Sequence, residues 1–276
     1  MEINSEKYWE NRFNTDWESN FGPAQTLFHY KTILENLPEW IKEIISNNKY
    51  SICDVGCGMG EGVNEFHNCF PESKIYGMDF SKYAIEKASK TFIEDNIYFF
   101  KGDILDFHHV FDIILSSHTL EHFNNPIEIC ENLSNYCKFL IISVPFREEN
   151  LWKEHEFSFD YSSFPIYLNN KRLIYYKEIE PLFFKEGDYS INEQILVIYA
   201  NELFIKDSTL VNMNSYYDDL LKLTSQYNRL KKNNNMLKKE NEMLVNKINK
   251  YKKENEHFKS SKVYNLWKKY ANFKDK

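Results

Sequence analysis

Short apolar segments alternate with amphipathic segments between about residues 50 and 145. The apolar segments are rich in β-branched and aromatic residues, which is typical of buried strands, and the segments between them have the length of helices. This order predicts βαβ units, with a parallel sheet covered by helices and a binding edge where the strands end. The predicted strands are 51–55, 74–79, 97–102, 111–116 and 138–144, and the predicted helices are 61–69 and 82–92.

Flanking segments extend this pattern on both sides. Residues 1–50 are rich in aromatic side chains and predict an N-terminal helical cap, whereas residues 150–170 lack periodicity and predict a loop or cap. A late strand is predicted over 194–200, QILVIYA. We therefore expect a doubly wound α/β domain over 51–210, with a seven-stranded, mostly parallel, Rossmann-like sheet.

A heptad pattern begins near residue 212 and predicts a long coiled-coil helix over 212–260. Leucine at d with asparagine at a is typical of a parallel two-stranded coiled coil, because paired asparagines select the register. A homodimer is the preferred interpretation. A single helix folded against the domain, antiparallel pairing and a foreign partner remain alternatives. The d positions are Leu223, Leu230, Leu237, Leu244, Tyr251 and Phe258, and the a positions are Leu220, Tyr227, Asn234, Asn241, Ile248 and Asn255.

Charge divides the chain in the same way. The net charge is −7, yet residues 222–276 carry 16 Lys and Arg against 5 Asp and Glu. Within this basic region, 261–276 places Leu266, Trp267 and Tyr270 among lysines at helical spacing, which is typical of an amphipathic tail. The tail could meet a membrane surface or a protein partner; a solvated helix explains it equally, and we expect no nucleic-acid partner.

Cellular location follows from what the chain contains. The first ten residues, MEINSEKYWE, are polar and acidic, and no apolar segment reaches the length of a membrane span. The five cysteines form no CxxC pair, which favours reduced thiols. We predict a cytoplasmic protein, with peripheral association at the inner membrane face as the alternative.

A glycine-rich turn is the strongest local signal. Residues 52–60, ICDVGCGMG, end a predicted strand near Asp54 and enter a predicted helix through three glycines, which let the backbone turn sharply beside a ligand. The spacing G-x-G-x-G differs from the dinucleotide fingerprint G-x-G-x-x-G. Asp54 would also repel a pyrophosphate, whereas it suits a ligand with an ammonium group. An ordinary tight loop remains the alternative.

Two more acids follow at the ends of the next predicted strands. Asp79 ends the second strand, where a carboxylate can accept both hydroxyls of a ribose, and Asp103 follows the third, near the position of an adenine amino group. Each acid alone would be explained as a helix N-cap. Together with the glycine turn they predict a nucleoside-shaped pocket.

This combination resembles the class I S-adenosylmethionine-dependent methyltransferase family over about residues 7–145. Residues 116–122, SSHTLEH, resemble the S-x-x-x-L-E-H signature after the fourth strand, and residues 8–13, YWENRF, resemble the segment that covers the cofactor. The resemblance implies S-adenosylmethionine as cofactor. It implies a cofactor site made of Trp9, Asp54, Gly56, Cys57, Gly58 and Gly60, of Asp79 and Phe80 at the ribose, of Asp103 and Ile104 at the adenine, and of Ser117 near the sulfonium.

Three histidines are candidate bases for a hydroxyl acceptor. His118 and His122 follow the fourth predicted strand, and His155 lies in the predicted cap; each would equally serve as a packing histidine. We expect no metal, because no carboxylate cluster with ligand spacing follows that strand. By analogy, the predicted acceptor is a small molecule or glycan precursor, O-methylated in a cell-surface polysaccharide pathway. The alternative is a cofactor-binding interaction protein that recruits a partner through its coiled coil.

Overall fold

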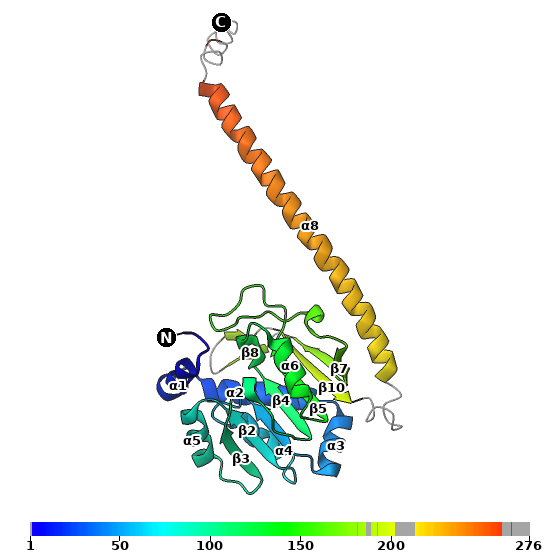
Figure 1. Ribbon diagram of the computed structural model, residues 1–276. Coiled ribbons are helices and arrows are strands. Elements are labelled where there is room, and N and C mark those ends of the chain that lie inside the picture. Colours follow the sequence, from blue (N-terminus) through cyan, green and yellow to red (C-terminus); the bar gives the residue numbers. More distant parts are fainter. Residues whose placement is uncertain are drawn as a thin grey trace. The chain divides into compact units, whose positions relative to one another are not determined.

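A computed structural model describes residues 2–180, 182–185, 189–191, 193–201, 213–260 and 266 (Figure 1). The chain forms two compact units, Met1–Leu220 and Leu221–Lys276, which are described separately below. The predicted basic tail 261–276 lies outside the described residues, apart from Leu266. Among the described residues, no helix has both the length and the apolar character needed to cross a membrane.

An eight-stranded mixed sheet forms the centre of the first unit, with strand order β3-β2-β1-β4-β5-β10-β7-β6. Strands β1 to β5 are mutually parallel, β10 is antiparallel to β5 and β7, and β6 is antiparallel to β7. A separate antiparallel pair is formed by β8 and β9. The bounds are β1 Ile52–Val55, β2 Ile75–Asp79, β3 Ile97–Lys101, β4 Ile113–Ser117, β5 Phe139–Pro145, β6 Tyr167–Leu168, β7 Lys171–Ile179, β8 Leu182–Phe184, β9 Tyr189–Ile191 and β10 Gln194–Asn201.

The doubly wound, mostly parallel architecture agrees with the prediction, whereas the predicted count of seven strands is wrong. The additional edge comes from a hairpin in which Leu168 of β6 pairs with Lys171 of β7. At two residues, β6 is too short to show a period, and Asn169 in the turn adopts a left-handed φ of 54°. No such hairpin was predicted in this part of the chain.

Helices cover the sheet, and several begin at recognisable caps. The Ser5 and Ser81 hydroxyls accept hydrogen bonds from Tyr8 N at 3.3 Å and Ala84 N at 3.1 Å, which satisfies amide groups at the starts of α1 and α5. Pro126 occupies the first turn of α6, where its missing N–H costs nothing. The bounds are α1 Glu6–Thr15, α2 Gly22–Asn36, α3 Glu39–Asn48, α4 Glu61–Cys69, α5 Lys82–Thr91 and α6 Pro126–Ser134, with 3-10 turns η1 Ile104–Asp106, η2 Leu120–His122 and η3 Tyr161–Ser163.

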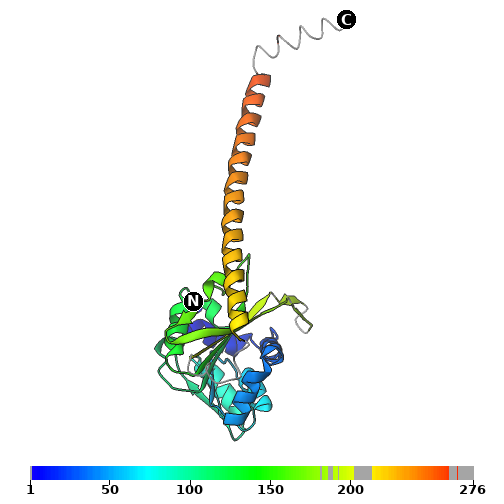
Figure 2. The same ribbon diagram turned by 90° about the vertical axis from the view of Figure 1, so that its right-hand side faces the viewer.

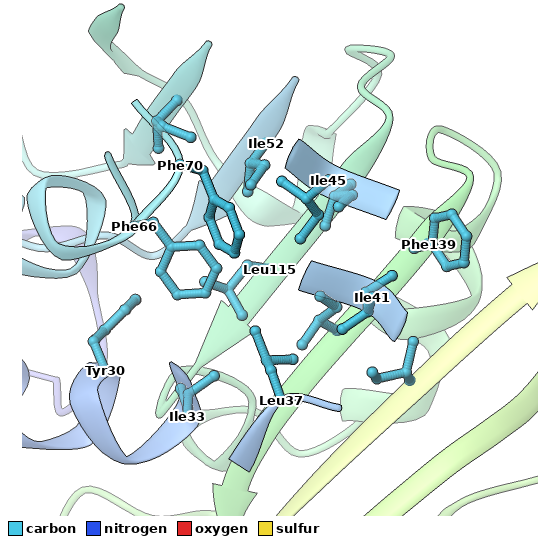
Figure 3. Close-up of a cluster of buried hydrophobic side chains, with 14 of the residues drawn as sticks. Tyr30, Ile33, Leu37, Ile41, Ile45, Ile52, Phe66, Phe70, Leu115 and Phe139 are labelled. Atoms are coloured by element: carbon cyan, nitrogen blue, oxygen red, sulfur yellow. The ribbon is translucent and has the colours of Figure 1, made fainter. Parts of the chain in front are cut away.

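Two apolar clusters pack against the sheet, because alternate residues of a strand point to opposite faces. In β1, Ile52 belongs to the cluster beneath α2, α3 and α4, whereas Cys53 and Val55 belong to the cluster that includes α6. Figure 3 shows the first cluster, where Ile41 of α3 and Phe66 of α4 lie over the strands. Each fully buried side chain of this kind contributes roughly 1.5–3 kcal/mol to folding. This packing fixes the strand ends that carry the site.

The helix α8, Met213–Ser260, is a continuous helix of 48 residues, and most of it belongs to the second unit (Figures 1 and 2). At 1.5 Å per residue such a helix is about 72 Å long. The d-position side chains of Leu230, Leu237 and Leu244 are 66%, 59% and 49% exposed. The predicted helix is therefore present, while its pairing with a second chain stays a prediction.

Candidate functional site

A cavity of about 440 Å³ lies at the carboxyl ends of β1, β2 and β4, between these strand ends, helices α1 and α2 and the segment 148–155. Its volume falls in the range of small-molecule sites. Two predicted site residues, Asp54 and Gly60, do not line it. Twelve do: Trp9, Gly56, Cys57, Gly58, Asp79, Phe80, Asp103, Ile104, Ser117, His118, His122 and His155.

The glycine turn between β1 and α4 is held tightly against β2. Gly56 N and Cys57 N donate hydrogen bonds to the Met78 carbonyl at 2.8 and 3.0 Å. Gly56 has a φ of 82°, and a Cβ at this position would lie 2.4 Å from Oγ1 of Thr119. Only glycine fits here, because both the left-handed backbone and the neighbouring side chain exclude a larger residue. The turn therefore presents bare backbone to the cavity.

Asp79 ends β2 as a buried carboxylate with a fixed orientation. Its Oδ2 accepts a hydrogen bond from Gly58 N at 2.9 Å, and its Oδ1 accepts one from Ser81 N at 2.8 Å. Burial raises the pKa of Asp79 to about 6, although these hydrogen bonds oppose the shift and nearby Glu10 adds to it. The glycine turn and Asp79 thus hold one another in position at the cavity wall.

Asp103 and Ile104 follow β3 and line the cavity. Oδ1 of Asp103 accepts a hydrogen bond from Leu105 N at 2.9 Å, which makes this acid the N-cap of η1. Ile104 is 6% exposed and offers an apolar surface beside the acid. The capping role and the predicted adenine-side role are compatible, because the same oxygen atoms have further lone pairs.

Asp54 lies behind the cavity rather than in its wall. Its Oδ2 accepts a hydrogen bond of 2.6 Å from the Tyr30 hydroxyl, and its Oδ1 is buried without a hydrogen-bond partner among the described residues. Burial raises the pKa of Asp54 to about 7, although the Tyr30 bond opposes this shift. The structure thus places Asp54 as a buried support of the turn.

Helix α1 covers one part of the cavity with aromatic side chains. Trp9, Phe13 and Trp17 pack together, and the Arg12 guanidinium lies 5.6 Å from the Trp9 ring. This helix is tied to the segment 148–155 by Glu154, whose Oε1 accepts hydrogen bonds from the Tyr8 hydroxyl at 2.6 Å and from Arg12 Nη1 at 2.8 Å. Trp9 was predicted. Arg12 and Glu154 were missed, although Arg12 lies within the YWENRF motif.

Three polar residues form a compact cluster in the cavity wall: Glu121 and His122 of η2, and His155. One ligand-type atom from each lies within 4.8 Å of the others. Nδ1 of His122 lies 2.9 Å from the Glu154 carbonyl, and Nδ1 of His155 lies 2.8 Å from Oε2 of Glu148. The structure brings together two of the three predicted histidines, and it adds Glu121 and the two glutamates that orient their rings.

The third predicted histidine, His118, belongs to a different contact. Its ring lies 3.7 Å from that of His29, centroid to centroid, at an interplanar angle of 32°. His118 Nε2 lies 3.2 Å from Oε1 of Gln194, and Nδ1 lies 3.5 Å from Oε1 of Glu121. Burial first, and then the neighbouring His118, hold the pKa of His29 well below its ordinary value. His29 and Gln194 were missed, because α2 and β10 are far from the motif in sequence.

Comparisons with known proteins agree with this geometry. Residues 46–162 match the model of a family described as a methyltransferase domain. A curated relative, malonyl-(acyl-carrier protein) O-methyltransferase of Bacillus anthracis, is 25% identical over 114 residues, which cover 40% of this chain and 42% of the relative. The chain therefore matches less than half the length of that relative. The domain match supports the predicted enzyme class, a methyltransferase, and the predicted cofactor, S-adenosylmethionine.

Solved structures of two methyltransferases share the fold. The plantazolicin methyltransferase, in complex with SAH, is 21% identical with a TM-score of 0.50, and the match covers 71% of this chain and 95% of that one. The magnesium protoporphyrin IX methyltransferase of Synechocystis PCC 6803, with bound SAH, is 12% identical with a TM-score of 0.50, and the match covers 71% and 100%. At these identities the likeness establishes the architecture.

Proposed function

We propose that this protein transfers a methyl group from S-adenosylmethionine to a hydroxyl of a small acceptor. The observation that carries the proposal is the convergence, in one cavity, of the glycine turn, Asp79 and Asp103 with the cluster of Glu121, His122 and His155. The first group suits an adenosine-containing ligand, and the second suits an acceptor that must lose a proton. Methyl transfer to oxygen needs both in the same pocket.

The cofactor side fits the residues present. Asp79 offers a fixed carboxylate to a ribose diol, and Asp103 beside Ile104 offers an acceptor and an apolar surface to an adenine. The bare backbone of Gly56 and Gly58 admits the methionyl part closely. When bound, S-adenosylmethionine supplies a methyl group that is already activated, so these residues serve to orient it and to exclude water.

The acceptor side supports oxygen as the atom that is methylated. His122 and His155, with His118 nearby, are the groups positioned to promote loss of the acceptor proton. Trp152 also lines the cavity and is 60% exposed, so its flat apolar face is open to a ring-shaped acceptor. A sugar ring with free hydroxyls meets both features. We therefore place a glycan precursor, in surface-polysaccharide synthesis, as the acceptor class.

Calorimetry with S-adenosylhomocysteine (SAH), the form of the cofactor that has lost its methyl group, tests the cofactor part of this proposal on the full chain. We expect one binding site per chain, and at least tenfold weaker binding in Asp79→Ala, because the buried carboxylate that would meet the ribose is lost. Asp106→Ala, an exposed acid in η1 that does not line the cavity, is the matched control and should bind normally. Equal affinity in wild type and Asp79→Ala would contradict the pocket assignment.

An acceptor screen that follows SAH formation tests the reaction. Sugar nucleotides and other glycan precursors should stimulate SAH release, and the product should carry a methyl ether. Cofactor binding without turnover on any hydroxyl compound would instead favour an interaction protein that recruits partners through α8.

We also infer that α8 pairs in parallel with α8 of a second copy. The support is the row of exposed d-position side chains, Leu230, Leu237 and Leu244, which a solvated helix would leave in water. The a positions Asn234 and Asn241 suit an identical partner, because two asparagines that meet across a dimer satisfy one another. The chain is therefore expected to act as a homodimer.

A further inference from the structure

We propose that Glu121, His122 and His155 bind one divalent transition-metal ion, which would hold the acceptor oxygen in the cavity. The inference rests on the proposed function for its role, and on the geometry of the three side chains for its location. It departs from the expectation, drawn from sequence spacing, that the site would contain no metal. That expectation looked for ligands near one another in sequence, whereas His155 reaches the site from the segment between β5 and β6.

The donor atoms converge closely enough for one ion. One ligand atom of each residue lies within 4.8 Å of the others, and all three residues line the cavity. Atoms that share a metal with bonds of about 2.0–2.2 Å lie roughly 3–4 Å apart, so small side-chain adjustments close the site. The backbone already links the two segments, because Glu156 N donates a hydrogen bond of 2.8 Å to the Glu121 carbonyl.

Both histidines are oriented as metal ligands usually are. The Glu154 carbonyl can only accept a hydrogen bond, so Nδ1 of His122 carries the proton and Nε2 carries the lone pair. Nδ1 of His155 faces the Glu148 carboxylate, which fixes the same tautomer. A carboxylate or carbonyl behind the ring is the arrangement that orients a ligating imidazole and raises its basicity. Both Nε2 atoms are thereby left to act as ligands.

Glu121 supplies an independent indication of a missing partner. The residue is 1% exposed, and Oε2 is buried with no hydrogen-bond partner among the described residues. Leaving a buried carboxylate oxygen unpaired is costly, so such atoms in folded proteins usually meet a proton donor or a cation. His118 meets Oε1 at 3.5 Å, which leaves Oε2 as the atom for a cation.

The donor set defines the class of ion. Two imidazoles and one carboxylate suit borderline ions such as Zn²⁺, Co²⁺, Mn²⁺ or Fe²⁺, whereas Mg²⁺ and Ca²⁺ prefer an all-oxygen shell. Three protein ligands leave coordination positions open, which is the mark of a catalytic rather than a structural site. An oxygen bound at an open position is polarised and releases its proton to solvent more readily. The acceptor class is then a hydroxyl compound that can ligate a metal.

Cobalt titration of the chelator-treated full-length protein tests this proposal, because bound Co²⁺ has visible absorption that reports nitrogen and oxygen ligands. We expect saturable binding of one Co²⁺ per chain, displaced by Zn²⁺ but not by a large excess of Mg²⁺. His155→Ala should weaken Co²⁺ binding more than a hundredfold, and Glu148→Gln should weaken it about 10- to 100-fold through ring orientation. The exposed pair His108 and His109 provides the control, since replacing both by Ala should leave the Co²⁺ signal unchanged.

Two results would overturn the metal site. One is the absence of Co²⁺ binding by the wild type. The other is equal Co²⁺ binding by the wild type and a folded His155→Ala variant, with folding checked by SAH calorimetry on the same samples. The proposed function would remain intact if SAH bound normally and methylation resisted chelators while no Co²⁺ site was found. The histidines would then act directly as bases. If the wild type did not bind SAH, the proposed function would be refuted, whatever the result of the Co²⁺ titration.

Discussion

The hydroxyl of Tyr30 on α2 donates a hydrogen bond of 2.6 Å to Oδ2 of Asp54, inside the turn-bearing end of β1. Both groups are almost fully buried, and the bond links a helix of the N-terminal cap to the strand that leads into the glycine turn. Burial raises the pKa of Asp54 to about 7 despite this bond. The folded state therefore retains a proton that the unfolded chain releases near the ordinary pKa of an aspartate.

The stability of the folded protein should fall as the pH rises from about 4 to about 7. Between pH 4 and pH 7 the folded chain binds more protons at Asp54 than the unfolded chain, so the free energy of unfolding decreases with pH and then levels off. Asp54→Asn lacks this dependence. Its stability relative to wild type should improve by about 2–3 kcal/mol between pH 5 and pH 8, measured by urea unfolding. Asp95→Asn, at an exposed site, is the control, and a constant difference for Asp54→Asn would contradict the assignment.

Tyr8 should control how firmly α1 covers the cavity. Tyr8→Phe removes the 2.6 Å bond to Glu154 and leaves the cavity-lining side chains of α1 in place. A hydrogen bond to a charged group contributes about 1.5–3 kcal/mol, so amide exchange across Glu6–Thr15 should accelerate at least tenfold, and SAH should bind more weakly. Tyr98→Phe, on the exposed edge strand β3, serves as the comparison. Unchanged exchange in α1 would show that other contacts hold it.

Two substitutions at heptad d positions of α8 should dissociate the proposed dimer. Leu237→Lys with Leu244→Lys places charges at the interface of a parallel coiled coil, where burial of an unpaired charge is unfavourable. Sedimentation equilibrium should show a dimer for the wild type and a monomer for this variant, with SAH binding retained. Lys239→Ala, on the outer face of the same heptad, should remain dimeric. A monomeric wild type would contradict the coiled-coil proposal.

Periodicity predicted the centre of the fold and failed at its edge. The strand of residues 75–79 and the helix of residues 61–69 were predicted within one residue, because buried strands and amphipathic helices alternate there with clear turn signals. The hairpin of β6 and β7 was not predicted. The two residues of β6 are too few to show an alternation of apolar and polar positions. Strand β7 mixes charged and apolar residues and lacks the continuous apolar character of β10.

The candidate site shows the same division between local and distant information. Gly56, Asp79 and Asp103 were predicted, because each lies at or just after the end of a strand and the ends of parallel strands meet at one edge. Their neighbours Glu154 and His29 were not, because nothing in a single sequence reports which side chains from α2 or from the segment after β5 fold over that edge. Asp54 was predicted in the wall and lies behind it, since a strand residue can face the layer of helices instead.

Glu154 has a consequence for how the binding of one reactant affects the binding of the other. Its side chain accepts hydrogen bonds from Tyr8 and Arg12 of the covering helix, while its backbone carbonyl accepts one from His122. The contact of α1 with Glu154 and the orientation of the His122 ring are thus thermodynamically coupled, and each favours the other by the same factor. A ligand that strengthens the contact between α1 and Glu154 therefore also favours the observed orientation of the His122 ring. This coupling predicts that the nucleoside ligand and the acceptor each strengthen the binding of the other by the same factor.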